Sequence, residues 1–360
     1  MEYAPARSSV RGAAGRLKAL GATALVLAAS GFGLSACGGP GTGGSAGGSG
    51  RTSLLLVSYA VTKTAYDRIL PGFKADWKKK TGEDLEITTS YGGSGSQTRA
   101  VIDGLEADVV TLALSDDVQK LQAAGLVQPG WEQEIPGNSV ITRSVVALIT
   151  REGNPKGLRQ WSDLSRPGVS VVTANPKTSG GARWNVLALW GSVKSTGGSD
   201  AQAAAFLGSI VQQVPSLPRD AREASDAFLK RNQGDVLLNY ENEAILARRS
   251  GNLKGGFVVP SRNISIEGPV AVVDRNVDRH GNRKAAEALA AYLQSEPAQA
   301  IFAEEGFRPV NATVWNRVKD RFAPVPELFT VESLGGWPQL DQTLFRNGGL
   351  WDQLLRQRRR

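Results

Sequence analysis

Short apolar runs rich in β-branched residues alternate with longer stretches of helical periodicity, and this alternation constrains the fold more than any other feature of the chain. The runs that we predict as strands are 53–58, 85–90, 107–114, 144–150, 169–174, 235–240, 255–260 and 269–274. The stretches that we predict as helices include 64–80, 179–194, 200–213, 221–231, 241–251 and 284–304. Strands that alternate with helices form βαβ units, so the pattern predicts an α/β fold with mostly parallel sheets flanked by helices.

These units fall into two consecutive sets, and the chain then returns to the first set near its end. We therefore expect two lobes with a ligand cleft between them, the first built from 53–140 plus 265–350 and the second from 141–264. Ligands of open α/β sheets bind outside the carboxyl ends of the strands, so the loops at those ends are the candidate binding loops. With 360 residues, 41% of them hydrophobic, the chain is long enough to give each lobe its own core.

The N-terminus has the pattern of a bacterial lipoprotein signal. A basic segment precedes the apolar stretch "ALGATALVLAASGFG", which is too short for a mature membrane span. The tetrapeptide "LSAC" that ends at Cys37 resembles a lipobox, in which the cysteine is lipidated and becomes the first mature residue. We predict 1–36 as the signal peptide and 37–52 as the lipidated cysteine with a glycine-rich tether. The protein would then be lipid-anchored in the extracytoplasmic space, either the periplasm or the outer face of the cell membrane.

The formal net charge of +8 is concentrated at the two ends of the chain. Residues 1–36 contribute +3 and the last five residues, "RQRRR", contribute +4, so the remainder carries only +1. A nearly neutral body does not indicate nucleic acid as a partner. We predict 351–360 as a basic, solvated and frayed C-terminal tail.

Three loops share the features of anion-binding segments. "YGGSGSQ" (91–97), "TSGGARW" (178–184) and "PRDAREAS" (218–225) each lead into a predicted helix. The N-terminus of a helix leaves backbone N–H groups unpaired and carries a partial positive charge, and glycine lets an anion approach those groups closely. One such loop is more often only a cap and a turn, but three of them in two lobes predict an anion-binding site.

The residues that catalysis would need are largely missing. His280 is the only histidine, and we expect it to be a solvated residue of the turn-like segment "DRHGN". One histidine and one cysteine cannot form a His/Cys zinc site, so we predict no metal ligands. "GGSGS" departs from the G-x-S-x-G pattern at its last position, and the chain contains no P-loop motif. We therefore predict no catalytic residues, no cofactor and no enzymatic activity.

Several of the same segments resemble one known family. The stretches "LLLVSY", "WKKKTGEDLEITTSYGGSGSQ", "VIDGLEADVVTLAL", "NPKTSGGARWN", "GDVLLNYENEA" and "FRPVN" are similar to the periplasmic sulfate-binding proteins of ABC transporters. The likeness covers nearly all of 53–350, and "NPKTSGGARWN" is its most specific motif. It implies the two-lobed periplasmic-binding-protein fold of type II. It also implies a fully dehydrated sulfate, held by uncharged donors that are mostly backbone N–H groups at helix N-termini.

The resemblance also implies which residues form the site. The sulfate contacts that it implies are Ser94 in the first lobe and Ser179, Gly180, Gly181 and Ala221 in the second. Tyr240 stands where the family has an indole donor, and Ala60 stands where the family has an aspartate that organises the first loop. The supporting residues that it implies are Ser58, Tyr59, Arg183 and Arg222, of which the two arginines are expected to brace loop backbones rather than touch the anion.

The chemistry of the loops agrees with sulfate. Sulfate carries no proton at neutral pH and only accepts hydrogen bonds, and "GGSGS" and "TSGGA" hold donors but no acidic residue. The sequence thus predicts a monomeric sulfate receptor that delivers its ligand to the permease subunits of an ABC importer. A receptor for thiosulfate, molybdate or phosphate, and less favourably an extracytoplasmic ester hydrolase, remain open alternatives.

Overall fold

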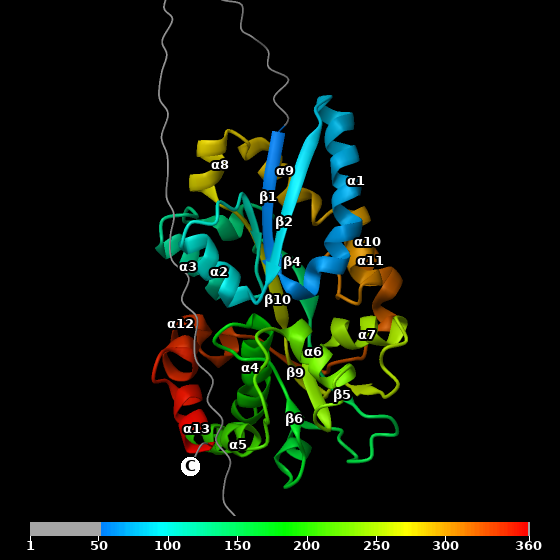
Figure 1. Cartoon of the computed structure of the whole chain (residues 1–360), viewed down its shortest axis with the longest axis vertical. Helices are drawn as coiled ribbons and strands as arrows, with labels where there is room; N and C mark the ends of the chain where they lie inside the picture. Colours follow the sequence, from blue (N-terminus) through cyan, green and yellow to red (C-terminus); the bar gives the residue numbers. More distant parts are fainter. Residues whose placement is uncertain (1–51, 359–360) are drawn as a thin grey trace, which may run out of the picture. The chain divides into compact units, whose positions relative to one another are not determined.

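The structure is a computed structural model that describes residues 52–358 (Figure 1). The predicted signal peptide 1–36 and the predicted lipidation site Cys37 lie outside the described residues. The described part forms two lobes, each built around one sheet (Figure 1). Within it, no helix is both long enough and apolar enough to span a bilayer.

The first lobe contains a five-stranded sheet with the strand order β2–β1–β3–β10–β4. Its strands are β1 (Thr52–Tyr59), β2 (Leu85–Gly92), β3 (Val109–Thr111), β4 (Val140–Ser144) and β10 (Ile266–Val272). β1 pairs in parallel with β2 and β3, whereas β10 runs antiparallel to both β3 and β4. Side chains of β1 alternate between the two faces of the sheet, so Leu56 and Val57 belong to different hydrophobic clusters.

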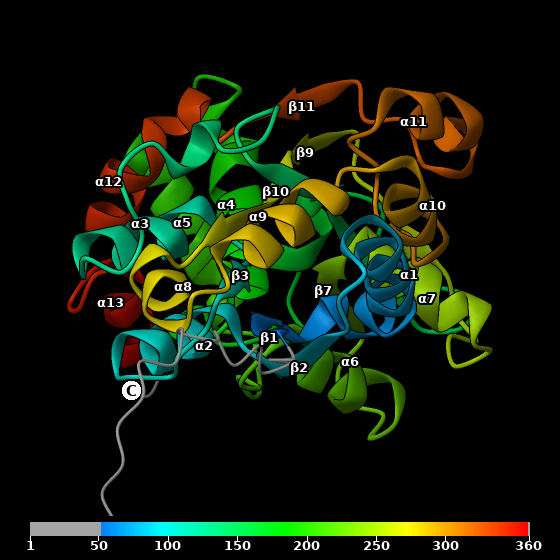
Figure 2. The ribbon, with the colours of Figure 1, turned by 90° about the horizontal axis from the view of Figure 1, so that it is seen from above.

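Helices cover both faces of this sheet (Figure 2). They are α1 (Lys63–Thr81), α2 (Ser94–Ile102), α3 (Ser115–Ala123), α8 (Asp274–His280), α9 (Arg283–Tyr292), α10 (Glu296–Glu304) and α11 (Ala312–Val318). In α1 the buried side chains include Ile69, Phe73 and Trp77, which recur at four-residue spacing as the sequence predicts. The helix continues through Pro71 and ends at Gly82, whose φ of 78° is the left-handed conformation that favours glycine.

The second lobe contains a four-stranded sheet with the strand order β6–β7–β5–β8. Its strands are β5 (Val146–Thr150), β6 (Val171–Val172), β7 (Val236–Tyr240) and β8 (Phe257–Val258). β6 pairs in parallel with β7, while β5 is antiparallel to both β7 and β8. The helices of this lobe are α4 (Gly180–Lys194), α5 (Asp200–Val211), α6 (Ala221–Leu229) and α7 (Glu241–Arg249). α4 is buried along most of its length, which explains the apolar composition of "WNVLALW".

The chain passes between the lobes in extended segments. β4 of the first sheet is separated from β5 of the second only by Val145, and β9 (Arg262–Ile264) is separated from β10 only by Ser265. Asn263 connects the two crossings, because its side chain accepts from the N–H of Val146 at 3.2 Å and donates to the Val146 carbonyl at 2.8 Å. Of these strands, β4, β5 and β10 run antiparallel to their neighbours. The predicted α/β class and two lobes are confirmed, but the sheets are mixed rather than mostly parallel.

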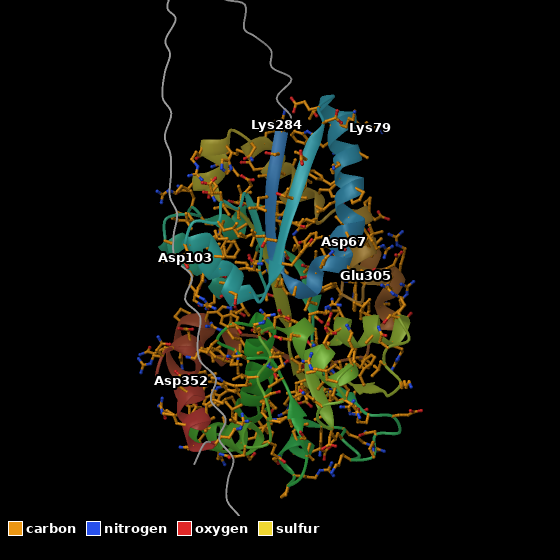
Figure 3. The ribbon with its side chains drawn as sticks, viewed as in Figure 1. Asp67, Lys79, Asp103, Lys284, Glu305 and Asp352 are labelled. Atoms are coloured by element: carbon orange, nitrogen blue, oxygen red, sulfur yellow. The ribbon has the colours of Figure 1, made fainter. Side chains whose placement is uncertain are left out.

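The last part of the chain packs on the second lobe (Figures 1 and 2). β11 (Glu327–Phe329) pairs with β9, and α12 (Gly336–Leu340), the π-helical turn η6 (Asp341–Phe345) and α13 (Leu350–Arg358) follow it. The remaining short helices are η1 (Ala60–Thr62), η2 (Trp131–Gln133), η3 (Trp161–Ser165), η4 (Lys319–Arg321) and η5 (Glu332–Leu334). Asp352 of α13, labelled in Figure 3, pairs with Lys177 of the second lobe at 3.0 Å.

The predicted frayed C-terminal tail is wrong as far as Arg358. Residues Leu350–Arg358 form the amphipathic helix α13, which buries Trp351 and Leu354 against the rest of the chain. Two apolar anchors three residues apart stabilise this helix, whose arginines, Arg356 and Arg358, are in its last turn. The lobe boundaries drawn from the sequence stay a prediction.

Candidate functional site

The three loops predicted from the sequence do lead into helix N-termini. α2 begins at Ser94 after the N-cap Gly93, α4 begins at Gly180 after the N-cap Ser179, and α6 begins at Ala221 after the N-cap Asp220. The first N–H groups of each helix have no intrahelical acceptor, so they are available to a ligand.

Two glycines bring these helix starts together. A Cβ atom added to Gly180 would lie 2.5 Å from the Cβ of Ala113 and 3.1 Å from the Cβ of Ser94, both in the first lobe. A Cβ atom added to Gly181 would lie 2.8 Å from Cε2 of Tyr240 and 3.2 Å from the Cβ of Ala221. These distances are too short for real Cβ contacts, so the packing requires glycine at both positions. The start of α4 thus lies against Ser94 on one side and against Ala221 and Tyr240 on the other.

The lobes meet closely at the same place. A Cβ atom at Gly93 of the first lobe would lie only 2.4 Å from the carbonyl oxygen of Thr178 in the second. Ser94, Ser179, Ala221 and Tyr240 are each between 1 and 6% exposed. The structure therefore corresponds to a closed arrangement that shields these residues from solvent.

The hydroxyl of Ser94 is fully engaged with the first lobe. It donates to Oδ2 of Asp117 at 2.7 Å and accepts from the N–H of Ala113 at 2.9 Å. Its single proton is therefore committed to the carboxylate, and the donor that Ser94 offers a ligand is its backbone N–H. The sequence reasoning missed Asp117, although the helix start "SDD" after a predicted strand was a signal that acidic side chains lie near this edge.

Ser179 has a different pattern of hydrogen bonds. Its Oγ accepts from the N–H of Ala182 at 3.3 Å, which makes it the N-cap of α4. Within residues 52–358, no acceptor receives the hydroxyl proton of Ser179. The side chain can therefore cap its helix and donate to a ligand at the same time.

The phenol of Tyr240 is buried and unpaired. Its hydroxyl has no hydrogen-bond partner among the described residues, and its ring centroid lies 6.1 Å from that of Tyr59. An unsatisfied buried hydroxyl costs about 1–3 kcal/mol, so a native structure rarely keeps one without a partner of another kind. Burial raises the pKa of Tyr240 well above its usual value, which keeps the phenol protonated and able to donate. The hydroxyl of Tyr240 is therefore a free hydrogen-bond donor for a ligand atom.

Ser58 and Tyr59 lie at the end of β1, next to the site. The Oγ atom of Ser58 lies 2.6 Å from Oγ1 of Thr62 and donates to the carbonyl of Thr111 at 3.0 Å. Thr62 in turn donates to the carbonyl of Tyr59 at 2.8 Å. These bonds fix the turn that begins at Ala60, the position where the family has an aspartate. Ser58 therefore braces this loop from within the lobe.

Arg183 and Arg222 connect the helix starts of the second lobe to the first. Arg183 donates to the carbonyl of Pro176 at 3.2 Å and pairs with Asp116 of the first lobe at 2.7 Å. Arg222 donates to the carbonyl of Val61 at 3.3 Å and pairs with the buried Glu243 at 3.0 Å. Burial raises the pKa of Glu243, and the charge of Arg222 opposes that rise.

Glu241 and Glu243, the two carboxylates in the first turn of α7, each pair with an arginine. Glu243 holds Arg222, and Glu241 forms a bidentate pair with Arg308 at 2.7 and 3.0 Å. Both carboxylates are buried, so each is placed to orient an arginine rather than to complement the helix dipole alone. The sequence missed these partners because they lie far away along the chain.

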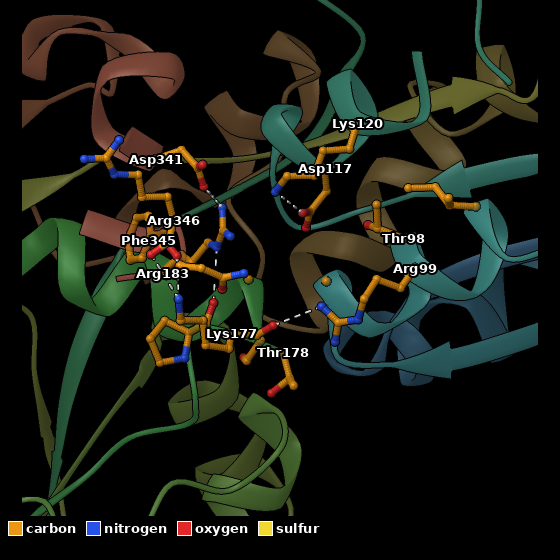
Figure 4. A pocket seen from close by; sticks show the side chains of 16 residues that line it. Thr98, Arg99, Asp117, Lys120, Lys177, Thr178, Arg183, Asp341, Phe345 and Arg346 are labelled. Carbon is orange, nitrogen blue, oxygen red and sulfur yellow. Dashed lines mark hydrogen bonds and ion pairs between the residues drawn. The ribbon is translucent and has the colours of Figure 1, made fainter. Parts of the chain in front are cut away.

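A cavity of about 290 Å³ adjoins the helix starts (Figure 4). Residues from both lobes line it, and Ser179 and Gly180 form part of its wall. In the described part of the chain, no group of three or more His, Cys, Asp or Glu residues is arranged to hold a metal ion. His280 lies elsewhere, at the end of α8, where it pairs with Asp108 and Glu106. The expectation that it lies in a loop is therefore wrong, whereas the residue is exposed to solvent as expected.

Comparison with known proteins gives one consistent result. The sequence pattern of the bacterial extracellular solute-binding proteins matches residues 54–308. A sulfate-binding protein of Synechococcus elongatus is 53% identical over 324 residues, which cover 89% of this chain and 91% of that protein. A thiosulfate-binding protein of Pseudomonas aeruginosa is 42% identical over 306 residues, with coverage of 84% and 91%.

Solved structures agree with the sequence relatives. The sulfate-binding protein SubI from Mycobacterium tuberculosis matches with a TM-score of 0.76 and 36% sequence identity, covering 82% of this chain and 99% of that one. The family resemblance seen in the sequence is thereby confirmed. So is the prediction of a binding protein rather than an enzyme, because these relatives are named as binding proteins.

Proposed function

The chain belongs to the bacterial extracellular solute-binding proteins, and on this basis we propose that it is the sulfate receptor of an ABC importer. Membership of that family supports a place of action outside the cytoplasm. The ligand would be the dehydrated dianion, bound between the lobes by backbone N–H groups and hydroxyls. The residues proposed to contact it are Ser94, Ser179, Gly180, Gly181, Ala221 and Tyr240.

The observation that carries this proposal is the meeting of three helix starts around the first turn of α4, beside the unpaired phenol of Tyr240. Burying a dianion is costly unless its oxygens are satisfied by hydrogen bonds. Helix starts supply N–H donors that are already oriented, together with a favourable dipole, and they need no neighbouring cation. The site therefore suits an anion that only accepts hydrogen bonds.

The carboxylates near the site support sulfate over phosphate. A phosphate that retains a proton would use an acceptor in the site. Asp117 accepts from Ser94, and Glu243 is paired with Arg222, so both nearest buried carboxylates are already engaged. A lining of donors whose nearby carboxylates are held by other side chains discriminates against protonated oxyanions.

The ligand would hold the two lobes closed, because it would contact N–H groups of both. The N–H of Ser94 belongs to the first lobe, whereas those of Gly180, Gly181 and Ala221 belong to the second. An anion that binds the N–H groups of both lobes stabilises the closed arrangement. The free energy gained is the difference between its affinity for the closed arrangement and its affinity for the open one. The crossings at Val145 and Ser265 are where such a motion would take place.

Thiosulfate is the second candidate ligand, because one relative with 42% identity is named as a thiosulfate-binding protein. Thiosulfate has the charge and tetrahedral shape of sulfate, with one sulfur in place of an oxygen. A phenol at position 240 in place of an indole alters one donor of the site.

The remaining parts of the proposal concern the ends and partners of the chain. We propose that residues 1–36 are removed, that Cys37 carries a lipid, and that 37–52 tether a monomeric receptor to the membrane beside its permease subunits. Metabolic labelling with a fatty acid tests the anchor: the wild type should be labelled and Cys37→Ser should not. Equal labelling of both would refute the lipid on Cys37.

Equilibrium titration of the purified, sulfate-free protein with sulfate, thiosulfate, molybdate and phosphate tests the ligand. We expect sulfate to bind most tightly and its affinity to change little between pH 6 and pH 8, because sulfate keeps the same charge over this interval. Tight phosphate binding without sulfate binding would contradict the proposal.

A further inference from the structure

The cavity beside the helix starts has an uneven distribution of charge. Two acidic side chains line it, Asp117 and Asp341. Five cationic side chains line it, namely Arg99, Lys120, Lys177, Arg183 and Arg346, so its formal lining charge is +3. This contrasts with the nearly neutral body of the protein, in which only a slight excess of positive charge remains once the two ends are set aside.

Three of these cations are neutralised by carboxylates. Lys120 pairs with Asp116 and Asp117, Lys177 pairs with Asp352, and Arg183 pairs with Asp116 and Asp341. Their charges are therefore largely compensated, and their side chains are held in place.

Arg99 is different. Its side chain is exposed, and within residues 52–358 no carboxylate lies within ion-pair distance of it. It stands on α2, whose N-terminus at Ser94 belongs to the candidate site, and it extends across to the second lobe (Figure 4). There it donates to the carbonyl of Lys177 at 3.1 Å, next to the segment that leads into α4. A second donor of the same guanidinium reaches Oγ of Ser96 at 3.3 Å.

This contact exists only while the lobes are together. Lys177 belongs to the second lobe and Arg99 to the first, so separation of the lobes breaks the bond and leaves an uncompensated guanidinium at the rim of the first lobe. A carbonyl oxygen satisfies the hydrogen-bonding capacity of the guanidinium without cancelling its charge.

We propose that Arg99 is the capture residue of the receptor: with the lobes apart its charge attracts the incoming dianion toward the start of α2, and with the lobes closed it ties α2 to the carbonyl of Lys177. The inference rests on the proposed function and adds to it a residue that acts on the rate of binding. Arg99 does not contact the buried ligand, so it is a positioning residue.

The size of the effect follows from electrostatics. One unit charge acting on a dianion across about 10 Å of water changes the local anion concentration by about threefold at low ionic strength, and by about 1.5-fold at physiological ionic strength. Loss of the closing hydrogen bond acts separately, on the dissociation rate.

Stopped-flow measurements of sulfate binding to the full-length protein can separate these effects. Trp184 provides the signal, because its indole donates to the carbonyl of Ala113 across the lobes at 2.8 Å. The variants are Arg99→Gln, which removes the charge, and Arg99→Lys, which keeps it. Arg159→Gln is the matched control, because Arg159 is also exposed and unpaired with any carboxylate of the described residues but does not line the cavity. Thermal unfolding without sulfate checks that each variant folds.

We expect Arg99→Gln to lower the association rate constant about threefold at about 10 mM ionic strength and about 1.5-fold at about 150 mM. Arg99→Lys should restore the association rate constant, and Arg159→Gln should leave it unchanged. An association rate constant for Arg99→Gln equal to that of the wild type at low salt, or an equal fall in Arg159→Gln, would overturn the inference. If the wild type does not bind sulfate, both the proposed function and the inference are wrong. If the wild type binds sulfate but Arg99→Gln has the same association rate constant, only the inference is wrong.

Discussion

The side chain of Asp117 accepts a hydrogen bond from the hydroxyl of Ser94 at 2.7 Å, although the two residues lie on different helices of the first lobe. This pair fixes the start of α2, because the same hydroxyl also accepts from the N–H of Ala113 at 2.9 Å. Ser94 therefore holds its loop with its side chain and leaves its backbone N–H for a ligand.

Ser94→Ala should weaken sulfate binding without abolishing it. The substitution leaves the N–H of Ala113 and the carboxylate of Asp117 without their partner, which destabilises the protein by about 1–3 kcal/mol. We expect a loss of sulfate affinity of about fivefold to tenfold, measured by calorimetric titration. Ser96→Ala, two residues further along α2, is the control and should bind as the wild type does. Complete loss of binding in a folded Ser94→Ala protein would mean that the hydroxyl itself contacts the anion.

Gly180→Ala should oppose closure of the lobes. The added Cβ would lie 2.5 Å from the Cβ of Ala113 in the first lobe, so the lobes would have to remain further apart. Overpacking of this kind costs about 1–3 kcal/mol, which corresponds to a fall in sulfate affinity of about 5- to 150-fold. Gly256→Ala is the matched control in the same lobe, because its added Cβ would lie 3.9 Å from Oγ1 of Thr150, an ordinary contact distance. Unchanged affinity in Gly180→Ala would show that the lobes do not close at this contact.

Tyr240→Phe should lower affinity while leaving the ligand-free protein at least as stable. The hydroxyl has no partner among the described residues, so its removal breaks no bond within them. A hydrogen bond to a charged group contributes about 1.5–3 kcal/mol, so we expect sulfate to bind at least about tenfold more weakly. Urea unfolding without sulfate and titration with sulfate measure the two effects. Tyr292→Phe in the first lobe is the control, and equal sulfate affinity in both variants would exclude the phenol of Tyr240 from the site.

The pair formed by His280 and Asp108 should make stability depend on pH. Nδ1 of His280 lies 2.7 Å from Oδ1 of Asp108, and this hydrogen bond raises the pKa of His280 above its ordinary value of 6.5. Because the pKa is higher in the folded protein, the stabilisation is complete below the unfolded value and is lost as the pH rises through the folded value. When the pH is raised from about 6 to about 9, we expect the free energy of unfolding to fall more in the wild type than in His280→Asn. The difference between the two proteins should be less than about 1 kcal/mol, because the pair is partly exposed. Urea unfolding at both pH values tests this, and parallel curves for the two proteins would contradict it.

Much of the fold could be predicted from local patterns. The predicted strand 85–90 corresponds to β2, whose sequence begins with alternating apolar residues. The predicted helix 64–80 corresponds to α1, whose apolar residues recur at four-residue spacing. The helix starts at 94, 180 and 221 follow from glycine and cap residues near the chain turns. Local chemistry determines these elements, so a local pattern predicts them.

Features that depend on distant parts of the chain could not be predicted in this way. The sequence predicts a single strand at 144–150, but the structure has two strands here, Val140–Ser144 and Val146–Thr150, which Val145 divides between two sheets. Asp117 was missed for a related reason, since its partner Ser94 is separated from it by 23 positions. The helix at Leu350–Arg358 was missed because its composition is polar and only Trp351 and Leu354 anchor it.

The crossings at Val145 and Ser265 have a mechanical consequence. Each is a single residue between two strands, and Asn263 ties one crossing to the other, so neither has slack chain that would let the lobes slide. These two crossings therefore favour rotation of the lobes over sliding, while a third connection runs from α11 to β11. In the proposed receptor, binding of the anion would change the angle between the lobes, so a partner that contacts both lobes could distinguish the loaded protein from the empty one without touching the anion.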